Sequence, residues 1–441
     1  MISKPLGRIG AVSALIVMTS MPALAASSQP YDVVEQFAEV LSVVEDEYVE
    51  PPQRETLAQG AIAGMVGSLD PHSAYMTPEQ YREFKQETSG KFAGIGVEVD
   101  LRDGQVIIIA PIANSPAEKA GLKSGDRIVA LDGVSLESLP VAEIVHRMRG
   151  VKGTAVHLVI RRSGVQGPVR IDVTRDDVWL PSIYTRAFDG QIAYVRIAAF
   201  QEGTHVELLS RVGELFSQLG KCRGMVLDLR QNPGGLVSES IAVADEFLGS
   251  GALFSTRHRG KIVEWVDTTN YGNFERIPLI TLVDSGSASA AEIVAGALKD
   301  RKRSAIIGER TFGKGTVQSI IDLPGGAGLR LTSLRYYTPS GIGIQTSGVL
   351  PDTVLASDET EDNPVRESDL PGRLPNDSPK ASATLAKPER TAANETEYRY
   401  AAPKPLKTIA QRIAELPARP TSANDRQLAF AYQALLEQLN R

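Results

Sequence analysis

Ser289 occupies a position from which a side-chain hydroxyl could act as a nucleophile. It lies in residues 284–292, which leave a predicted strand and enter a predicted helix. The unpaired N–H groups and the positive pole at a helix start favour an activated nucleophile and can also hold an oxyanion. A structural role fits as well, because Ser289 and Glu292 are spaced as a capping box, which is common at helix starts without catalysis.

Lys314 is the residue that could accept the proton of such a hydroxyl. It lies in the short turn Gly313-Lys314-Gly315, next to apolar strands. Partial removal of the amine from water favours its neutral form and moves its pKa from about 10.4 towards neutrality, so that it can act as a base. A Gly-Lys-Gly sequence is also typical of an ordinary surface turn.

The histidines are a second possible source of a base. A Ser–His–Asp triad is recognised by geometry and not by sequence order, so the sequence does not exclude one. None of the histidines lies in a glycine-rich turn, however, and nothing nominates a particular one. They are His72, His146, His157, His205 and His258.

Nucleotide and metal chemistry are both disfavoured by the sequence. Gly308, Gly313 and Lys314 fit the G-x-x-x-x-G-K part of a phosphate-binding loop, but position 315 holds Gly where the magnesium ligand Ser or Thr should stand. There is no His-Glu-x-x-His sequence, no paired cysteine and no cluster of histidines. We therefore expect no metal and no cofactor. Cys222 is the only cysteine and is interpreted as a structural thiol that forms no intramolecular disulfide.

The composition is that of a soluble, acidic protein with more than one domain. A length of 441 residues is too great for one compact core and indicates two or three domains. Apolar residues make up 42% and charged residues 23%, which are ordinary values for a globular protein. With a net charge of −6, the chain has no reason to bind nucleic acid or anionic lipid.

The first 25 residues have the pattern of an export signal. Lys4 and Arg8 form a positive region, residues 9–19 are a short apolar stretch, and Ala23-Leu24-Ala25 supplies a cleavage site with small residues. The apolar stretch is too short to span a bilayer comfortably. We therefore expect cleavage near Ala25 and an exported, periplasmic protein. No cysteine follows the site, so a lipoprotein is not expected.

Residues 26–88 are predicted to form an N-terminal helical region. Apolar side chains in residues 31–48 recur at alternating spacings of three and four, which predicts a helix that Pro51-Pro52 stops. Further helices are expected over residues 55–68 and from Pro78. The apolar stripe of the first helix could pack on neighbouring helices or form an oligomer seam.

Two further regions of the chain have different predicted patterns of strands and helices. Residues 89–174 contain short β-branched strands, including 105–109 and 154–160, and a helix at 140–149, as in a compact mixed domain. From residue 175 strands and helices alternate, which predicts an α/β layer up to residue 356. The expected strands there are 192–200, 225–229 and 278–283, the helices are 204–219, 238–248 and 289–299, and a hairpin follows at 316–337.

The end of the chain is predicted to be a tethered helix. Residues 357–403 are rich in polar residues and Pro and cannot bury enough apolar surface to offset the entropy of ordering, so we expect a disordered linker. Residues 404–441 form a C-terminal helical segment, in which residues 425–440 carry an apolar stripe. That helix either docks on its own domain or pairs with a partner.

Four motifs in a fixed order give the chain a resemblance to a known family. They are Asp-Leu-Arg-Gln-Asn-Pro-Gly-Gly at 228–235, Gly-Ser-Ala-Ser-Ala-Ala-Glu-Ile at 286–293, Thr-Phe-Gly-Lys-Gly-Thr-Val-Gln at 311–318 and Tyr-Tyr-Thr-Pro-Ser-Gly at 336–341. Together they resemble the carboxyl-terminal processing proteases, tail-specific serine peptidases of bacteria and chloroplasts. The likeness runs from about residue 31 to residue 352, and Leu-Asp-Pro-His-Ser at 69–73 also fits it.

The resemblance implies specific roles for the candidate residues. Ser289 would be the nucleophile, Lys314 the general base, and Gln318 the residue that orients the lysine amine. The backbone N–H of Ala290, with that of Gly234 or Gly235, would form the oxyanion hole, in which one donor typically lowers the barrier by about 3 kcal/mol.

This chain departs from the family pattern at two positions. Ala291 stands where the family usually has Ser, and Ile342 stands where it usually has a basic residue. Ala291 lies on the helix, two residues past the nucleophile, so we expect little effect. Ile342 would alter a surface or partner contact, not the dyad.

Residues 89–174 resemble a PDZ domain of the bacterial type. Phe92, Gly94, Ile95 and Gly96 fit its carboxylate-binding loop, in which successive backbone N–H groups hold a terminal carboxylate while the peptide adds as a strand. Alternatively, these glycines only make a turn. Arg149, at the end of the expected helix, would sense bound peptide or merely complement the helix C-terminus.

Two hypotheses follow for an α/β multidomain protein with these parts. The first is a serine endopeptidase that captures C-terminal tails of exported proteins with its PDZ-like domain. The resemblance further implies an inactive resting state opened by substrate or by an adaptor protein, and the terminal helices make a homo-oligomer plausible. The second is a non-catalytic PDZ scaffold with a vestigial peptidase fold. The intact Ser289, Lys314 and Gln318 favour the first.

Overall fold

The computed structural model describes residues 30–440 apart from 103–104, 113, 137–138, 270, 357–363, 379–407 and 424. It divides into two compact units, Met1–Ala61 and Ile62–Arg441. The predicted export signal lies outside the described residues. Among the helices that are described, none is long and apolar enough to cross a membrane.

The first unit contains α1 (Pro30–Glu47) and the beginning of α2 (Arg54–Gly67). Both helices agree with the sequence expectation, and Pro51-Pro52 lies between them. The Arg54 guanidinium donates to the Glu45 carboxylate at 2.6 and 2.5 Å, which joins the two helices. On the apolar stripe predicted for residues 31–48, Val34, Phe37 and Tyr48 are each more than half exposed, whereas Leu41 and Val44 are partly buried.

The PDZ-like region is built around an antiparallel sheet in the order β3-β4-β5-β7-β8, with β6 beside β5. Its core is made of alternate strand residues and two helices, and includes Ile108, Leu158, Ile160 and Ile144. The elements are β2 (Lys91–Gly94), β3 (Val97–Arg102), β4 (Gln105–Pro111), α4 (Pro116–Lys119), β5 (Arg127–Leu131), β6 (Val134–Ser135), α5 (Val141–Met148), β7 (Ala155–Arg161), β8 (Val169–Thr174) and β9 (Asp176–Trp179). Strands β2 and β9 pair with each other.

The main sheet of the following region has the order β10-β11-β12-β15-β16-β19. Strand β10 is antiparallel to β11, and the other strands are parallel. All residues of β12 and β15 are buried, as expected for parallel strands covered on both faces. The strands are β10 (Ile183–Phe188), β11 (Ile192–Ile197), β12 (Gly224–Asp228), β15 (Leu279–Val283), β16 (Ala305–Gly308) and β19 (Thr353–Val354).

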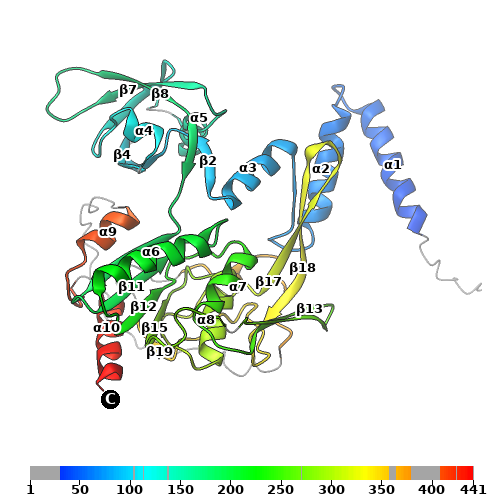
Figure 1. Cartoon of the computed structure of the whole chain (residues 1–441). Helices are drawn as coiled ribbons and strands as arrows, with labels where there is room; N and C mark the ends of the chain where they lie inside the picture. Colours follow the sequence, from blue (N-terminus) through cyan, green and yellow to red (C-terminus); the bar gives the residue numbers. More distant parts are fainter. Residues whose placement is uncertain are drawn as a thin grey trace, which may run out of the picture. The chain divides into compact units, whose positions relative to one another are not determined.

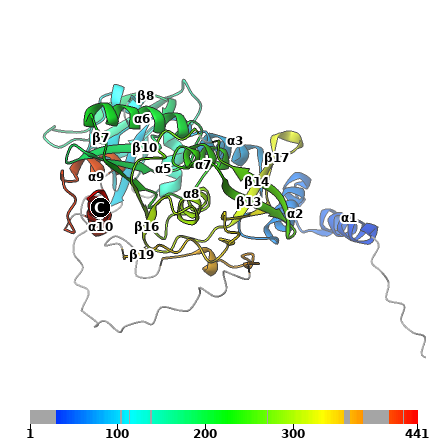
Figure 2. The ribbon, with the colours of Figure 1, turned by 60° about the horizontal axis from the view of Figure 1, so that its bottom comes forward.

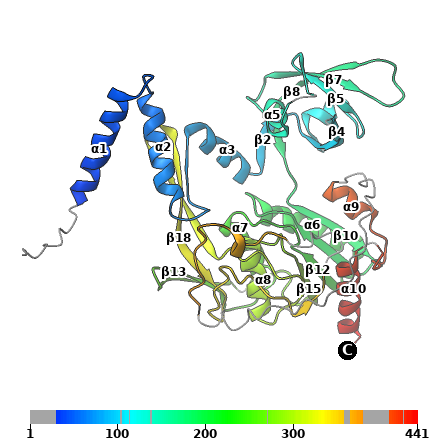
Figure 3. The same cartoon turned by 180° about the vertical axis from the view of Figure 1, so that it is seen from behind.

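Helices pack on both faces of this sheet. Alternate strand residues such as Val195 and Leu227 join one core with α6 (Thr204–Leu219), α7 (Val237–Asp245) and α8 (Ala290–Asp300). Residues between them, such as Tyr194 and Val226, join a second core with α9 (Ile409–Glu415) and α10 (Arg426–Leu439). Figures 1 and 3 show β12 and β15 between α8 and α10. The α/β layer expected from the sequence is therefore confirmed.

The C-terminal helix docks on its own domain. Leu428, Tyr432 and Leu435 of α10 are buried against the sheet. The Tyr432 ring packs edge-on against Phe188, with ring centroids 6.0 Å apart. The sequence left open whether this helix docks on its own domain or pairs with a partner. In the structure its apolar stripe packs on its own domain.

A second sheet carries the predicted hairpin. Its order is β1-β18-β13-β14, with β17 also paired to β18, and β14 forms an edge (Figure 2). The strands are β1 (Ala74–Met76), β13 (Ala252–His258), β14 (Lys261–Asp267), β17 (Thr316–Asp322) and β18 (Gly328–Tyr337). Helix α3 (Pro78–Thr88) follows β1, as Pro78 predicted.

Part of the segment expected to be a disordered linker has a defined conformation. Residues 364–378 contain a short 3-10 helix, Glu367–Asp369, and the Glu367 side chain is fully buried. Composition averages over a segment, whereas these residues are ordered by contacts with distant positions, among them a bond from Arg366 to the Thr311 carbonyl. The expectation of disorder over the whole of 357–403 is therefore wrong for residues 364–378.

Candidate active site

Three turns meet at the carboxyl ends of the parallel strands β12, β15 and β16. Ligands of open α/β sheets bind at this edge, because the loops that leave neighbouring parallel strands gather there. The turns are held together by backbone hydrogen bonds: Ala288 N–H donates to the Asn232 carbonyl at 2.9 Å, and Phe312 N–H donates to the Ser287 carbonyl at 3.0 Å. The motifs at 228–235, 286–293 and 311–318 are thus brought into one place.

Ser289 has a strained backbone at the sharp turn between β15 and α8. Its φ is 54° and its ψ is −115°, a region that residues with a side chain rarely adopt. Such conformations cost about 1–3 kcal/mol and gather at functional sites. A strained strand-to-helix turn of this kind holds the nucleophile of α/β-hydrolases, where it exposes the hydroxyl.

The carboxylate of Glu292 connects the serine turn with the lysine turn. Glu292 is fully buried, and its oxygens accept the backbone N–H groups of Ser289 at 2.8 Å, Gly313 at 2.8 Å and Lys314 at 2.9 Å. The Thr311 hydroxyl adds a fourth bond at 2.5 Å. Burial raises the pKa of Glu292 to about 7, against the effect of these four donors. The capping contact expected from the sequence, between Glu292 and Ser289 N–H, is therefore present. It is one of the four hydrogen bonds that the carboxylate accepts.

The surroundings of Lys314 lower the pKa of its amine, which is the direction that favours a base. Burial lowers the pKa of its amine, and the nearby Arg330 guanidinium lowers it further, while the carboxylates Glu367, Glu292 and Asp70 act in the opposite direction. The Tyr336 hydroxyl donates a short hydrogen bond to the Lys314 carbonyl and also contacts the Ser289 side chain. Tyr336 is itself buried, so it links the two turns on a second side.

Gln318 lies on β17, four residues beyond Lys314. Its amide nitrogen donates to the hydroxyls of Thr316 at 3.0 Å and Thr332 at 3.2 Å. Thr332 donates in turn to Asp70 Oδ1 at 3.0 Å. Within the described part of the chain no hydrogen bond joins Gln318 to the Lys314 amine, so the contact expected from the resemblance is not made in this conformation.

The segment 69–73 supports this side of the site. Asp70 accepts from the Ser73 hydroxyl at 2.7 Å and from the His72 N–H at 2.9 Å. Although burial acts to raise it, the pKa of Asp70 is lowered by Ser73, by His72 N–H and by Thr332. Arg330 donates to the His72 carbonyl at 2.9 Å, which ties the segment to β18.

The two glycines proposed for the oxyanion hole lie against the serine turn. Gly234 has a φ of 98°, and a Cβ there would lie 2.8 Å from Ser289 Cβ and 2.9 Å from the Ala290 nitrogen. Gly235 has a φ of 137°, and a Cβ there would lie 2.0 Å from the Phe200 carbonyl oxygen. Gly234 N–H donates to Asn232 Oδ1 at 2.9 Å. Only glycine fits either position.

The candidate peptide-binding loop follows β2 in the PDZ-like region. The carbonyl of Ile95 accepts from Ala117 N–H at 2.7 Å, and that of Gly96 accepts from Ile112 N–H at 3.0 Å. The backbones of Gly94 and Arg149 form an isolated antiparallel β-bridge. The Arg149 guanidinium lies 5.3 Å from the centre of the Phe92 ring. Arg149 therefore lies beside Phe92 and Gly94, two of the residues that the sequence nominated for this loop.

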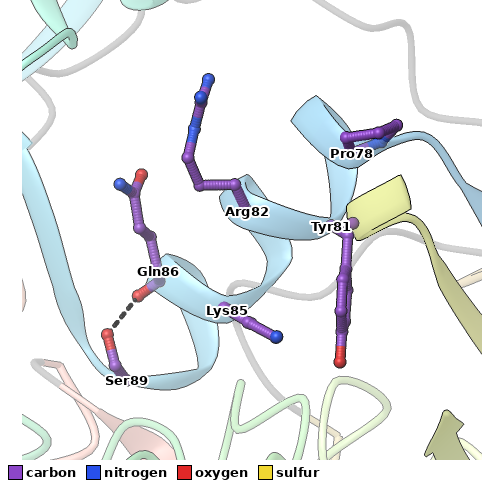
Figure 4. Close-up of a pocket in the computed structure, with 7 residues that line it drawn as sticks. Pro78, Tyr81, Arg82, Lys85, Gln86 and Ser89 are labelled. Atoms are coloured by element: carbon purple, nitrogen blue, oxygen red, sulfur yellow. Dashed lines mark hydrogen bonds between the residues drawn. The ribbon is translucent and has the colours of Figure 1, made fainter. Parts of the chain in front are cut away.

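A surface hollow of about 360 Å³ lies elsewhere, along α3 (Figure 4). Tyr81, Arg82, Lys85 and Ser89 line it, together with Gly326. Lys85 is already engaged, since its amine donates to Asp322 at 3.1 Å and lies 4.0 Å from the centre of the Tyr81 ring. None of the candidate catalytic residues lines this hollow.

Comparisons with known proteins match the same regions. Family descriptions of peptidase family S41, of the PDZ domain and of the activating protease CtpB N-terminal domain match residues 191–355, 83–161 and 17–80. The chain is 38% identical over 384 residues to the carboxy-terminal-processing protease of Bartonella bacilliformis, covering 85% of this chain and 88% of that protein.

Two further similarities extend the comparison. The carboxy-terminal processing protease CtpA of Bacillus subtilis is 36% identical over 310 residues, covering 70% of this chain and 66% of that protein. The solved structure of a photosystem II D1 C-terminal processing protease is similar with 30% identity and a TM-score of 0.46, covering 73% of this chain and 92% of that chain.

Proposed function

Because this chain belongs to the carboxyl-terminal processing proteases, serine peptidases of family S41, we propose that it cleaves peptide bonds with Ser289 as nucleophile and Lys314 as general base. The observation that carries this assignment is the Glu292 carboxylate, which accepts the backbone N–H of both residues. The lowered pKa of Lys314 and the strained backbone of Ser289 support it independently.

The chemistry requires the Lys314 amine to be neutral at the start. The amine takes the hydroxyl proton of Ser289 while Oγ forms a bond to the carbonyl carbon, and the carbonyl electron pair moves onto its oxygen. Collapse of this intermediate expels the amine of the leaving peptide, which receives the proton from Lys314. A water molecule then repeats the attack on the ester, with Lys314 again as base, and releases the new carboxyl terminus.

The oxyanion of that intermediate is proposed to accept from Ala290 N–H and from Gly234 or Gly235 N–H. The close approach of Gly234 to the Ala290 nitrogen supports this placement. Gly234 N–H donates to Asn232 Oδ1 in this conformation, so it would have to leave that acceptor to bind the oxyanion. Gln318 is proposed to orient the amine. Since Thr316 and Thr332 already bind its amide nitrogen, the amide oxygen is the atom that would accept from the lysine.

The PDZ domain is proposed to bind C-terminal tails of protein substrates. Strand β3, which follows the loop at 92–96, pairs only with β4 and so presents one free edge within the described sheet. A peptide can add as a strand to such an edge, with its terminal carboxylate on the backbone N–H groups of Ile95 and Gly96. Arg149, next to Phe92, would then contact the end of the bound tail.

The location and assembly of the protein are part of the same proposal. We propose export to the periplasm on the basis of residues 1–25, with exported proteins as substrates and an adaptor or the substrate itself as activator. A homo-oligomer would use α1, whose apolar side chains are exposed, because α10 uses its own apolar stripe on the sheet.

The test uses the full chain without residues 1–25 and fluorescently labelled β-casein, a protein without a stable fold. Ser289→Ala and Lys314→Ala are expected to reduce cleavage to background while the chain stays folded, which thermal unfolding checks. Ser217→Ala, on the exposed side of α6, and Lys261→Ala, on the edge strand β14, are matched controls that should cleave normally. Cleavage by either dyad variant would refute the dyad.

A further inference from the structure

The ordered residues 364–378, here called the strap, return to the turn that carries Lys314. Glu367 N–H donates to the Phe312 carbonyl at 3.2 Å. The Arg366 guanidinium donates to the Arg310 carbonyl at 2.5 Å and the Thr311 carbonyl at 3.0 Å. The strap therefore holds three successive carbonyls, at 310, 311 and 312, just before Gly313 and Lys314.

Glu367 extends this contact with its side chain. The carboxylate is fully buried and lies 2.8 Å from His72 Nε2, while its other oxygen accepts from Gln345 Nε2 at 2.8 Å. Gln345 in turn accepts from Gly315 N–H at 2.9 Å. A relay of two hydrogen bonds thus runs from Glu367 to the residue that follows Lys314, so the turn is fixed on both sides of the lysine.

The charges that influence the ionisation of the Lys314 amine come from four different elements. Arg330 on β18 disfavours the ammonium form, whereas Glu367 on the strap, Glu292 on α8 and Asp70 before β1 favour it. His72 and Tyr336 are the other titratable groups beside these residues. Of the three carboxylates, Glu367 has the largest effect on the amine.

Burial of the Glu367 carboxylate costs free energy of folding that a neutral side chain of the same shape would not cost. Removing a carboxylate from water costs several kcal/mol, and an amide of the same shape could accept the bond from Gln345 without that cost. The charge itself is what an amide would lack. The charge lies 2.8 Å from His72 Nε2, and it also favours the ammonium form of the Lys314 amine.

We propose that Glu367 is a positioning residue for Lys314, through which the strap fixes the lysine turn and controls the charge state of its amine. This inference rests on the proposed role of Lys314 as general base. Since the strap lies beyond residue 355, where the match to peptidase family S41 ends, the active site is completed by a segment outside that match.

The test compares Glu367→Ala, Glu367→Gln and the control Asp369→Asn in the full chain without residues 1–25. Asp369 is exposed on the same strap, so its variant removes the same charge away from Lys314. Rates are measured with labelled β-casein across pH. Glu367→Ala is expected to lower kcat on the order of tenfold or more with little change in KM, because the base is displaced. Glu367→Gln keeps the acceptor for Gln345 and should recover most of that loss.

The pH profile tells positioning apart from a merely structural role. Removing the negative charge disfavours the ammonium form, so Glu367→Gln should shift the acid limb of kcat/KM to lower pH, and Asp369→Asn should not. The same shift is expected in a His72→Asn background, which removes the imidazole beside residue 367. A second readout is the titration of the Lys314 amine in chain labelled with 13C-lysine, assigned by the signal that disappears in Lys314→Ala.

Two results would overturn the inference while leaving the dyad intact. One is a Glu367→Ala variant with normal kcat. The other is a Glu367→Gln variant whose acid limb and Lys314 titration match those of the wild type. By contrast, full activity in Lys314→Ala would remove the proposed function itself, and the inference with it.

Discussion

A single oxygen of Glu292 accepts the backbone N–H of Ser289 at 2.8 Å and that of Lys314 at 2.9 Å. These residues lie in different turns, separated by strand β16, and the same carboxylate sets the place of both. Because the carboxylate is buried, its hydrogen bonds are not exposed to competition from water. The relative position of the proposed nucleophile and base therefore depends on a residue that takes no part in the chemistry.

Replacement of Glu292 should affect stability and activity together. Glu292→Ala leaves three N–H groups and the Thr311 hydroxyl without their acceptor, and we expect a loss of about 3–5 kcal/mol in the free energy of unfolding. The remaining folded protein should cleave on the order of tenfold more slowly or worse, because the two turns lose their common anchor. Urea unfolding and cleavage rates measure both, with the exposed Glu264→Ala on β14 as control. Normal activity in folded Glu292→Ala would show that the anchor is dispensable.

Cleavage and stability should both depend on the ionisation of Lys314. Burial lowers the pKa of its amine below the usual 10.5, and only the neutral amine is a base, so kcat/KM should rise with pH through that lowered pKa. The unfolded chain binds the proton more readily, so stability should also rise with pH between the folded and the unfolded pKa. Lys314→Met has no amine to remove from water, so it should be inactive. At pH values below the folded pKa of Lys314 it should also be more stable than the wild type. Thermal unfolding at several pH values provides the check, and a less stable Met variant at low pH would contradict it.

Gly234 should tolerate no side chain. An added Cβ would lie 2.8 Å from Ser289 Cβ, and the φ of 98° is unfavourable for any other residue. We expect Gly234→Ala to lower kcat about 100-fold or more, by displacing the proposed oxyanion donors. Gly190→Ala is the matched control, since Gly190 also has a positive φ, 65°, but nothing lies within 4 Å of its Cβ position. If Gly190→Ala lowers kcat as much as Gly234→Ala, the loss is caused by backbone strain and not by the displacement of the oxyanion donors.

The C-terminal helix should be needed for the stability of the peptidase domain. Asp425 caps α10 by accepting Leu428 N–H at 2.9 Å, and it pairs with the buried Arg230 at 2.7 Å. Asp425→Ala removes a cap and leaves part of the Arg230 guanidinium unpaired, so we expect a loss of about 2–4 kcal/mol. Urea unfolding should show this loss, and Glu437→Ala, exposed on the same helix, should be neutral. An equal effect of both variants would mean that the Arg230 pair does not matter.

Tail binding should require a free carboxylate on the peptide. Binding of a labelled apolar peptide to full-length Ser289→Ala can be followed by fluorescence anisotropy. A C-terminal amide in place of the carboxylate should weaken binding about tenfold or more, since it loses charge-assisted bonds to the loop at 92–96. Equal binding of both peptides would exclude recognition of the terminus by this loop.

The sequence by itself determined the local elements and the order of the site motifs. Short, mainly apolar runs such as 279–283 specify buried strands, and the spacing of Leu428, Tyr432 and Leu435 specifies the last helix. Both patterns depend only on neighbouring residues. Ser289 and Lys314 were nominated as nucleophile and base by the four ordered motifs that surround them, because each residue alone also fits a structural role. The β13–β14 hairpin was not predicted; its β14 residues are mostly exposed, so no clear alternation marks it.

Only the tertiary structure decided how these residues meet. The joint role of Glu292 depends on β15 and β16 lying side by side, which brings N–H groups from residues 313 and 314 to a carboxylate at 292. The order in residues 364–378 depends on Glu367 reaching His72, which is 295 positions away in the chain. Contacts across such separations leave no trace in spacing or composition, because they are set by the packing of whole elements and not by any local preference.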